Sequence, residues 1–238
     1  MSKREELKAK RKKQVMQQRL TVIGIIVVGA LLIAGILIYP SLTPVGAFTV
    51  PTTVAYPQVK DNSMGDPNAP VKLVIYADFQ CPACGNWAKE YEQGIIAKYV
   101  ATNKVYFVYT PFSFIDDNGP GTESKDAAAA AFCAMDQGKF WEYHDTLYAN
   151  QTGENSGDFT PKRLAAFAQK LGLNLSQFNT CFDSGKYKSL VLQDKAEGTA
   201  LGINSTPSFA VDGKLVVLQS SYNELDTAID AALAAKTK

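Results

Sequence analysis

The chain has 238 residues, of which 46% are hydrophobic, enough for one core of moderate size or one domain with an insertion. Its formal charge of +1 hides an asymmetry, because residues 1–19 hold eight Lys or Arg and two Glu, which leaves 16 basic and 21 acidic residues in the remainder. A basic tail on a mildly acidic body argues against a nucleic-acid-binding face, so no nucleic-acid partner is expected.

An uncharged apolar segment, Leu20–Tyr39, follows the basic tail. In helical form it spans about 30 Å, the thickness of the bilayer hydrocarbon core, and a soluble core helix is rarely this long and apolar on every side. A cleaved signal peptide is the stronger alternative, with Val45-Gly46-Ala47 as a weak cleavage site, but its apolar core would have only about 7–15 residues. We predict an uncleaved transmembrane anchor over 20–39.

The charge distribution predicts the orientation of this anchor. Eight basic residues precede the span, and the next one after it is Lys60. The positive-inside rule makes residues 1–19 a cytoplasmic tail and places the rest outside, in a single-pass protein of the cell membrane. The four cysteines then lie in an extracytoplasmic compartment where they are free to be oxidised. Residues 40–69 hold five prolines and are predicted to form an extended tether.

A strand–helix–strand unit opens the folded domain, which is expected to begin near Pro70. Residues 71–79, VKLVIYADF, form an apolar and β-branched run typical of a buried strand, and residues 104–112 form a second one. Between them, Pro82 suits the first turn of a helix. This order predicts two parallel strands joined by a crossover helix.

The second half of the domain returns to strands after a long helical region. Residues 123–201 are predicted to contain four or five helices, and residues 208–218 form two short apolar runs around Asp212-Gly213, a strong hairpin signal. We therefore predict an α/β fold in which residues 70–122 and 202–238 form the sheet domain and residues 123–201 form a helical insertion.

The segment Cys81-Pro82-Ala83-Cys84 lies between the first strand and its helix. Free amide N–H groups and the helix dipole favour negative charge at a helix start, so a thiolate on Cys81 is stabilised and becomes a good nucleophile and leaving group. A disulfide between Cys81 and Cys84 would add only about 2 kcal/mol of stability. Exchange chemistry therefore explains the pair better than a structural disulfide does.

A metal site is the other alternative for this pair. A structural zinc or copper site requires further ligands. The sequence has a single histidine, His144, and no second CxxC segment. We therefore expect no metal, and a thiol–disulfide couple is the preferred interpretation.

Two segments carry a family resemblance: VIYADFQCPACGNW around the cysteines, and INSTPSFAVDG about 125 residues later. With the helical insertion between them, they resemble the DsbA-like branch of the thioredoxin superfamily over about residues 65–238. The resemblance implies a thioredoxin fold with an inserted helical domain, here preceded by a single transmembrane helix. It also implies that Pro207 is cis, lies against the cysteines and, with Thr206, leaves backbone groups free to bind an extended substrate chain.

The insertion also resembles that of relatives in this family. Its Gly-Lys-Phe-Trp stretch, residues 138–141, precedes His144, and we expect the aromatic side chains and His144 to be packed in the core. Some relatives carry a second disulfide here, which implies a structural bond between Cys133 and Cys181 worth up to about 4 kcal/mol. A redox relay or two buried free thiols are the alternatives for Cys133 and Cys181.

Two departures from the family concern the tuning of the cysteine pair. Proteobacterial DsbA has His before the second cysteine, where this chain has Ala83, and the dipeptide Pro82-Ala83 influences the reduction potential. Relatives often carry a buried Glu six residues before the first cysteine, where this chain has Ile75. The nearest acid is Asp78, which is expected either to assist proton transfer to Cys84 or to cap the helix.

The resemblance implies an extracytoplasmic thiol–disulfide oxidoreductase, most simply an oxidase of exported proteins with Cys81 and Cys84 as catalytic residues. No organic cofactor is required, and a membrane protein of the DsbB or vitamin K epoxide reductase type is the expected reoxidant, by analogy. A monomer is expected. A reductase or isomerase of the same fold is the alternative enzyme, and a chaperone or metal carrier is the non-enzymatic alternative.

Overall fold

The computed structural model describes residues 3–42, 44–52, 54–218 and 221–236. By its internal contacts the chain forms two units, Met1–Val45 and Gly46–Lys238. Each unit is described by itself.

The first unit is one long helix, α1 (Lys3–Leu42). Its stretch Lys10–Ile36 is long and apolar enough to cross a membrane. Ile25, Leu31 and Ile36 leave 67% or more of their surface exposed, which is unfavourable in water and favourable in lipid. The predicted span lies inside this helix, and the basic tail is helical as well because α1 begins at Lys3.

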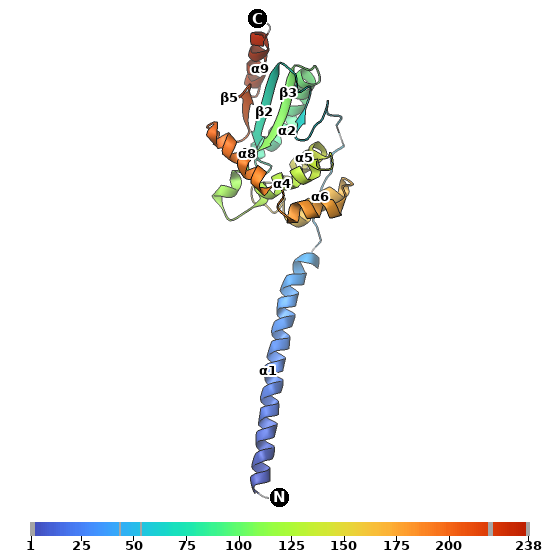
Figure 1. The fold of residues 1–238 in the computed structure, drawn as a ribbon, viewed down its shortest axis with the longest axis vertical. Helices are drawn as coiled ribbons and strands as arrows, with labels where there is room; N and C mark the ends of the chain where they lie inside the picture. The colour runs from blue at the N-terminus through green and yellow to red at the C-terminus, as the bar shows by residue number, and fades with distance from the viewer. Residues whose placement is uncertain (1–2, 43, 53, 219–220, 237–238) are drawn as a thin grey trace. The chain divides into compact units, whose positions relative to one another are not determined.

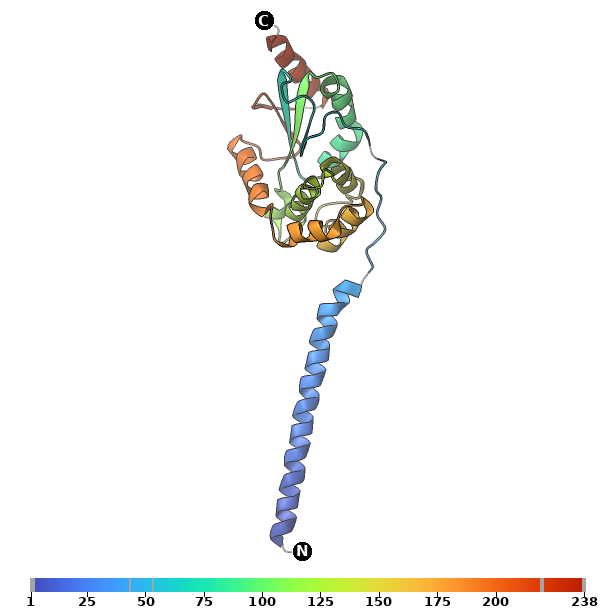
Figure 2. The same cartoon turned by 45° about the vertical axis from the view of Figure 1, so that its right-hand side comes forward.

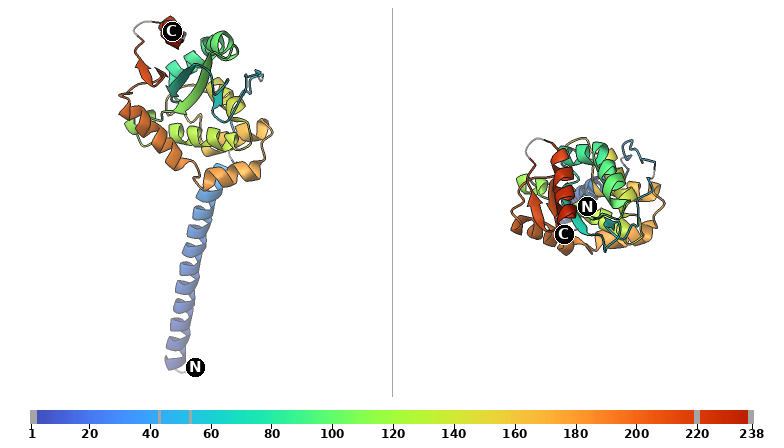
Figure 3. Two further views of the ribbon diagram at one scale, coloured as in Figure 1. Left: turned by 45° about the horizontal axis from the view of Figure 1, so that its top comes forward. Right: turned by 90° about the horizontal axis from the view of Figure 1, so that it is seen from above.

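The second unit is built on a five-stranded mixed sheet with strand order β1-β3-β2-β4-β5. Strands β2 and β3 are parallel neighbours and lie where the sequence predicts the two strands of the strand–helix–strand unit. The other neighbouring strands are antiparallel. The hairpin β4–β5 forms one edge of this sheet (Figure 3). The strands are β1 (Ser63–Met64), β2 (Val71–Ala77), β3 (Val105–Pro111), β4 (Ser208–Val211) and β5 (Lys214–Val216).

Helices cover both faces of the sheet, and the insertion helices gather at one of its ends (Figures 1 and 2). Among the described residues, five α-helices lie between β3 and β4, as the sequence predicts. The helices outside the insertion are α2 (Pro82–Glu90), α3 (Glu92–Ile95), the π-helical turn η1 (Ile96–Val100) and α9 (Asn223–Lys236). Between β3 and β4 lie the 3₁₀ turn η2 (Ile115–Asn118), α4 (Glu123–Met135), α5 (Phe140–Ala149), α6 (Pro161–Lys170), α7 (Leu175–Asp183) and α8 (Lys188–Ala200).

The alternation of side chains along β2 assigns its residues to two apolar layers. Leu73 and Ile75 are fully buried in the main core, which also contains Leu225 of α9. Tyr76 points to the opposite face, where α8 approaches so closely at Gly198 that an added Cβ would lie 2.7 Å from the Phe112 ring. Each large apolar side chain buried in these layers contributes about 1.5–3 kcal/mol.

The structure places residues 46–69 in the compact unit, although the sequence suggested an extended tether over 40–69. Helix α1 occupies the first residues of that range, and β1 pairs with β3 near its end. In between, Phe48 packs edge-on against Phe167 with ring centroids 5.0 Å apart, and the Tyr56 hydroxyl donates to Asp145. These contacts join residues that are about 90–120 positions apart in the sequence. A local sequence pattern therefore cannot predict them.

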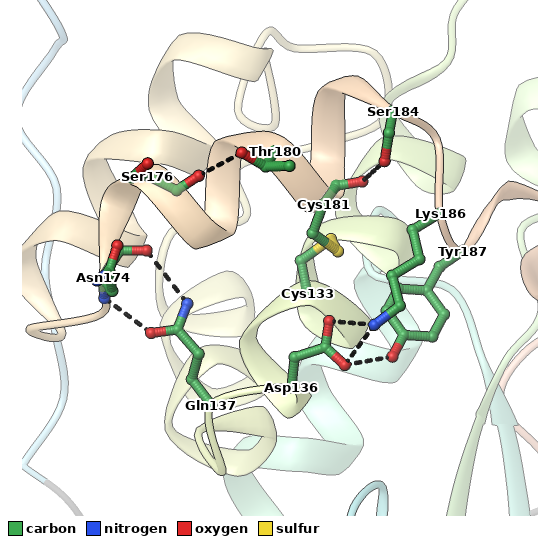
Figure 4. Close-up of a disulfide and its surroundings, with 10 residues drawn as sticks. All are labelled: Cys133, Asp136, Gln137, Asn174, Ser176, Thr180, Cys181, Ser184, Lys186 and Tyr187. Carbon is green, nitrogen blue, oxygen red and sulfur yellow. Dashed lines mark hydrogen bonds and ion pairs between the residues drawn. A yellow bond between two sulfur atoms is a disulfide. The ribbon is translucent and has the colours of Figure 1, made fainter.

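A disulfide joins Cys133 of α4 to Cys181 of α7 across the insertion (Figure 4). Beside it, the Asp136 carboxylate accepts hydrogen bonds from the Lys186 ammonium group at 2.7 and 2.8 Å and from the Tyr187 hydroxyl at 2.6 Å (Figure 4). The covalent bond holds the C-terminal end of α4 against α7, and the polar contacts hold it against the turn between α7 and α8.

Removing this disulfide is expected to destabilise the insertion. Replacing Cys133 and Cys181 together by Ala should lower the free energy of unfolding by about 2–4 kcal/mol, because the unfolded chain loses a closed loop. Urea denaturation of the full chain in detergent measures the change. Thr180→Ala, which removes an exposed hydroxyl next to Cys181, is the control. Equal stability of the double variant and the control would contradict the expectation.

Candidate active site

The turn between β2 and α2 places the cysteine pair at the end of the central strand. The Cys81 backbone N–H donates to the Asp78 carbonyl at 3.0 Å, which closes the turn. Cys81 has extended backbone angles and is the N-cap residue of α2, and Pro82 occupies the first turn, where its missing N–H is not needed. The two cysteines therefore lie in the first turn of α2, as the sequence predicts.

The surroundings of Cys81 favour its thiolate form. The residue is 7% exposed, and both Cys81 and Cys84 are free in this structure. A hydrogen bond from the Cys84 thiol is the main reason that the pKa of Cys81 is lowered to about 6, and the backbone N–H groups of Cys84 and Ala83 act in the same direction. Burial opposes this shift. Cys81 is thus ionised at neutral pH.

Cys84 has the opposite character. It is fully buried, and burial raises its pKa well above its ordinary value of 9.0, an effect to which the neighbouring Cys81 adds. At neutral pH the pair therefore consists of one thiolate near the surface and one thiol in the interior. The Cys81 sulfur can therefore react with another molecule, whereas the buried Cys84 sulfur can react only with Cys81.

Thr206 lies against Cys81, although it is 125 residues away in the sequence, and Pro207 follows it directly. The peptide bond between them is cis, as the resemblance implies, and β4 begins directly after it. The Thr206 carbonyl oxygen is 3.3 Å from the Cys81 sulfur, so a Cys81 thiol donates to it. The Thr206 hydroxyl is buried, and it helps to lower the pKa of Cys81 and opposes the rise in the pKa of Cys84.

Asp78 holds the loop beneath the cysteines and does not cap α2. One carboxylate oxygen accepts from the Gln80 N–H at 2.9 Å and the other from the Ile115 N–H at 3.1 Å. Among the described residues, α2 has no side-chain cap. Burial raises the pKa of Asp78 to about 6. Of the two roles expected for Asp78, proton transfer to Cys84 is compatible with this position and capping of α2 is not.

An aromatic groove lies beside the pair and was not foreseen from the sequence. Trp87 of α2 and Tyr91, the C-cap residue of α2, line this groove together with Tyr222, which precedes α9. Tyr222 lies near enough to the cysteines that their charge helps to raise its pKa, after burial. Trp87 and Tyr91 follow Cys84 by three and seven residues, a helical spacing from which their position on the same face of α2 could have been predicted. Tyr222 joins them only through tertiary packing.

His144 is fully buried among aromatic rings, as expected for a packed side chain. Its Nδ1 lies 3.0 Å from an Asp145 carboxylate oxygen, and its Nε2 lies 3.8 Å from a Glu92 oxygen. These three side chains are the described residues that could together offer ligand atoms to a metal ion. Burial lowers the pKa of His144, but Glu92 and Asp145 outweigh it and raise that pKa, while burial raises the pKa of Glu92 to about 7. Among the described residues, the His144 Nε2 and one Glu92 oxygen have no hydrogen-bond partner.

The asymmetry of the pair predicts its titration. In the reduced full chain, thiolate absorbance at 240 nm should rise with a midpoint near pH 6. Cys84→Ala should move this midpoint upward because it removes the main hydrogen bond to the thiolate. The stability of the reduced chain relative to the oxidised chain should also rise between pH 6 and 9, because the folded reduced pair binds fewer protons than the unfolded pair in that range. A Cys81 midpoint near 9 would contradict this geometry.

Comparison with known proteins places these features in a family. A family model described as Thioredoxin matches residues 58–231. The probable disulfide bond formation protein D of Bacillus anthracis is 30% identical over 173 residues, which cover 72% of this chain and 77% of that protein. The residues that the family model matches contain the cysteine pair and the insertion.

Solved structures agree with this assignment. Oxidised BdbD from Bacillus subtilis has a TM-score of 0.66 and 23% identity, with 73% of this chain and 93% of that chain covered, and it shares the fold. A thioredoxin-like oxidoreductase from Silicibacter pomeroyi has a TM-score of 0.58 and 28% identity, with 71% and 90% covered. The predicted thioredoxin fold with a helical insertion is confirmed. The chain belongs to the thioredoxin superfamily, as a DsbA-like thiol–disulfide oxidoreductase.

Proposed function

We propose that this protein is an extracytoplasmic oxidase that forms disulfides in exported proteins, with Cys81 and Cys84 as its catalytic residues. The observation that carries the proposal is the lowered pKa of Cys81 beside the buried thiol of Cys84. A stabilised thiolate exists only in the reduced pair, so it makes the reduced state more stable and the disulfide a stronger oxidant.

The proposed reaction transfers two electrons from two substrate thiols to the cysteine pair. A substrate thiolate attacks the Cys81 sulfur of the Cys81–Cys84 disulfide, and Cys84 leaves and takes up a proton. The second substrate thiolate then attacks the substrate sulfur of this mixed disulfide, and Cys81 leaves as a thiolate. Its low pKa makes Cys81 a good leaving group, which favours release of the oxidised substrate.

Nearby residues have supporting roles in this proposal. Thr206 and Pro207 bind the substrate backbone next to the reacting sulfur, in keeping with their position against Cys81. Asp78 supplies the proton that Cys84 takes up, which its buried position and raised pKa support. Pro82 and Ala83 tune the potential through their position between the two sulfurs.

We place the catalytic unit outside the cell membrane. Residues 20–39 of α1 would be the anchor, residues 1–19 would remain in the cytoplasm, and the unit from Gly46 onward would be exported. Within that unit, residues 70–122 and 202–238 form the thioredoxin-fold part and 123–201 the insertion. A monomer, reoxidised by a membrane protein of the DsbB or vitamin K epoxide reductase type, completes the proposal.

The reduction potential tests the proposed direction. Equilibration of the full chain with glutathione should give a value well above about −180 mV, as for oxidants, and a value near about −270 mV, as for thioredoxin, would overturn the oxidase role. The chain should also accelerate oxidative refolding of a reduced disulfide protein. Cys81→Ser should abolish this activity. Cys84→Ser cannot form the Cys81–Cys84 disulfide and should abolish it as well, and its Cys81 thiolate should be trapped as a mixed disulfide when it attacks oxidised glutathione, which releases reduced glutathione. Unchanged activity of both variants would point to a chaperone.

Protease access tests the proposed orientation. A protease added outside intact spheroplasts should digest the unit from Gly46 onward and spare an epitope tag on the N-terminus. Detergent should make the tag sensitive as well. Digestion of the tag and protection of the catalytic unit would reverse the assignment. Loss of the tag from the mature chain would instead indicate cleavage of the apolar segment.

A further inference from the structure

Gln151 reaches from the insertion to the backbone of the cysteine loop. It follows the C-cap of α5 and is half-buried. Its side-chain amide nitrogen donates to the Phe79 carbonyl at 2.6 Å and to the Cys81 carbonyl at 2.8 Å. The two N–H groups of this one amide therefore bind the backbone carbonyls of the residues on either side of Gln80, at the start of α2.

The first turn of α2 leaves room for this side chain. A Cβ at Gly85 would overlap the Gln151 side-chain oxygen, so glycine permits the close approach. The Gly85 N–H also donates to the Cys81 carbonyl at 3.1 Å. The Cys81 carbonyl thus accepts one hydrogen bond from within α2 and one from the insertion.

Gln80 makes the reverse connection. It is fully buried, and its amide nitrogen donates to the Ser124 hydroxyl at 2.8 Å, while its oxygen accepts from the Asn155 N–H at 2.6 Å. The loop that carries Gln151 and Asn155 is itself fixed, because the Asp158 carboxylate accepts from the Thr152 N–H and hydroxyl. The cysteine loop and the loop after α5 are therefore joined by two glutamine side chains that run in opposite directions.

We infer that Gln151 is a positioning residue for thiol exchange, which holds Cys81 so that its sulfur faces the N–H groups at the start of α2. This inference rests on the proposed function. The stabilisation of a thiolate by hydrogen bonds depends strongly on distance and direction. The disulfide form has no charge to stabilise, so a fixed Cys81 backbone favours the reduced form selectively and increases oxidising strength.

Two substitutions of Gln151 separate its contributions. Gln151→Leu keeps the approximate size and removes both donors. Gln151→Glu keeps the shape and brings a carboxylate toward two carbonyl oxygens and the thiolate. We expect Gln151→Leu to raise the pKa of Cys81 by about one unit and to shift the equilibrium constant with glutathione about tenfold toward the protein disulfide. Gln151→Glu should have the larger effect, and the excess should disappear at a pH low enough to protonate its carboxyl group.

Gly85→Ala tests the same contact from the opposite side. The added methyl group should displace the Gln151 amide and shift the pKa of Cys81 in the same direction, although alanine is a better helix former than glycine. Asn150→Ala is the matched control. Asn150 is the neighbouring residue, and the hydrogen bonds that its amide makes within the described residues go to the backbone of Thr49 and Thr146, not to the cysteine loop. It should lower the thermal stability and leave the pKa and the equilibrium constant unchanged.

The measurements are the absorbance titration at 240 nm, equilibration with glutathione and thermal unfolding, all on the full chain in detergent. Gln151 variants that lose stability like Asn150→Ala, but keep the parental pKa and equilibrium constant within about twofold, would overturn the positioning role and leave the proposed oxidase intact. A parent chain without a low-pKa thiolate would overturn the proposed function, and this inference with it. Agreement of Gln151→Leu and Gly85→Ala supports the inference.

Discussion

The negative charge on the Cys81 sulfur has to be held at the start of α2, and the arrangement of the active site depends on this one requirement. The Cys84 thiol and two backbone N–H groups favour the charge. Strand β2 leads directly to the start of α2, and the Asp78 carboxylate fixes the turn between them. Thr206 lies against the Cys81 sulfur from the start of β4. Because the charge exists only in the reduced pair, the same interactions influence both the reactivity of Cys81 and the reduction potential of the pair.

The insertion supports this arrangement from behind. Its aromatic residues and His144 fill the space next to β3 and Phe79, so that the floor of the site is tightly packed. Polar side chains of the following loop then reach the backbone around the cysteines. An insertion of this kind therefore does more than cover the sheet. It supplies hydrogen bonds that the strand–helix turn cannot make within its own segment.

Local patterns predicted the parts of the site that are encoded in one short segment. The apolar run of β2, the proline at the start of α2 and the hairpin around Asp212-Gly213 each follow from a few adjacent residues. The strand Ser63–Met64, with two residues, has no readable alternation. Gln151 and Tyr222 were missed for a similar reason, since an isolated glutamine or tyrosine acquires a role only from its partners in the folded chain.

The disulfide of the insertion has a consequence for how the protein matures. A newly made chain carries four thiols, and the bond between Cys133 and Cys181 has to be formed by an oxidant that the new chain does not yet possess. Under the proposed function, a finished copy of the protein would supply that oxidant. The new chain would then itself be an exported polypeptide with a disulfide to form, and so a substrate for other copies of the same protein.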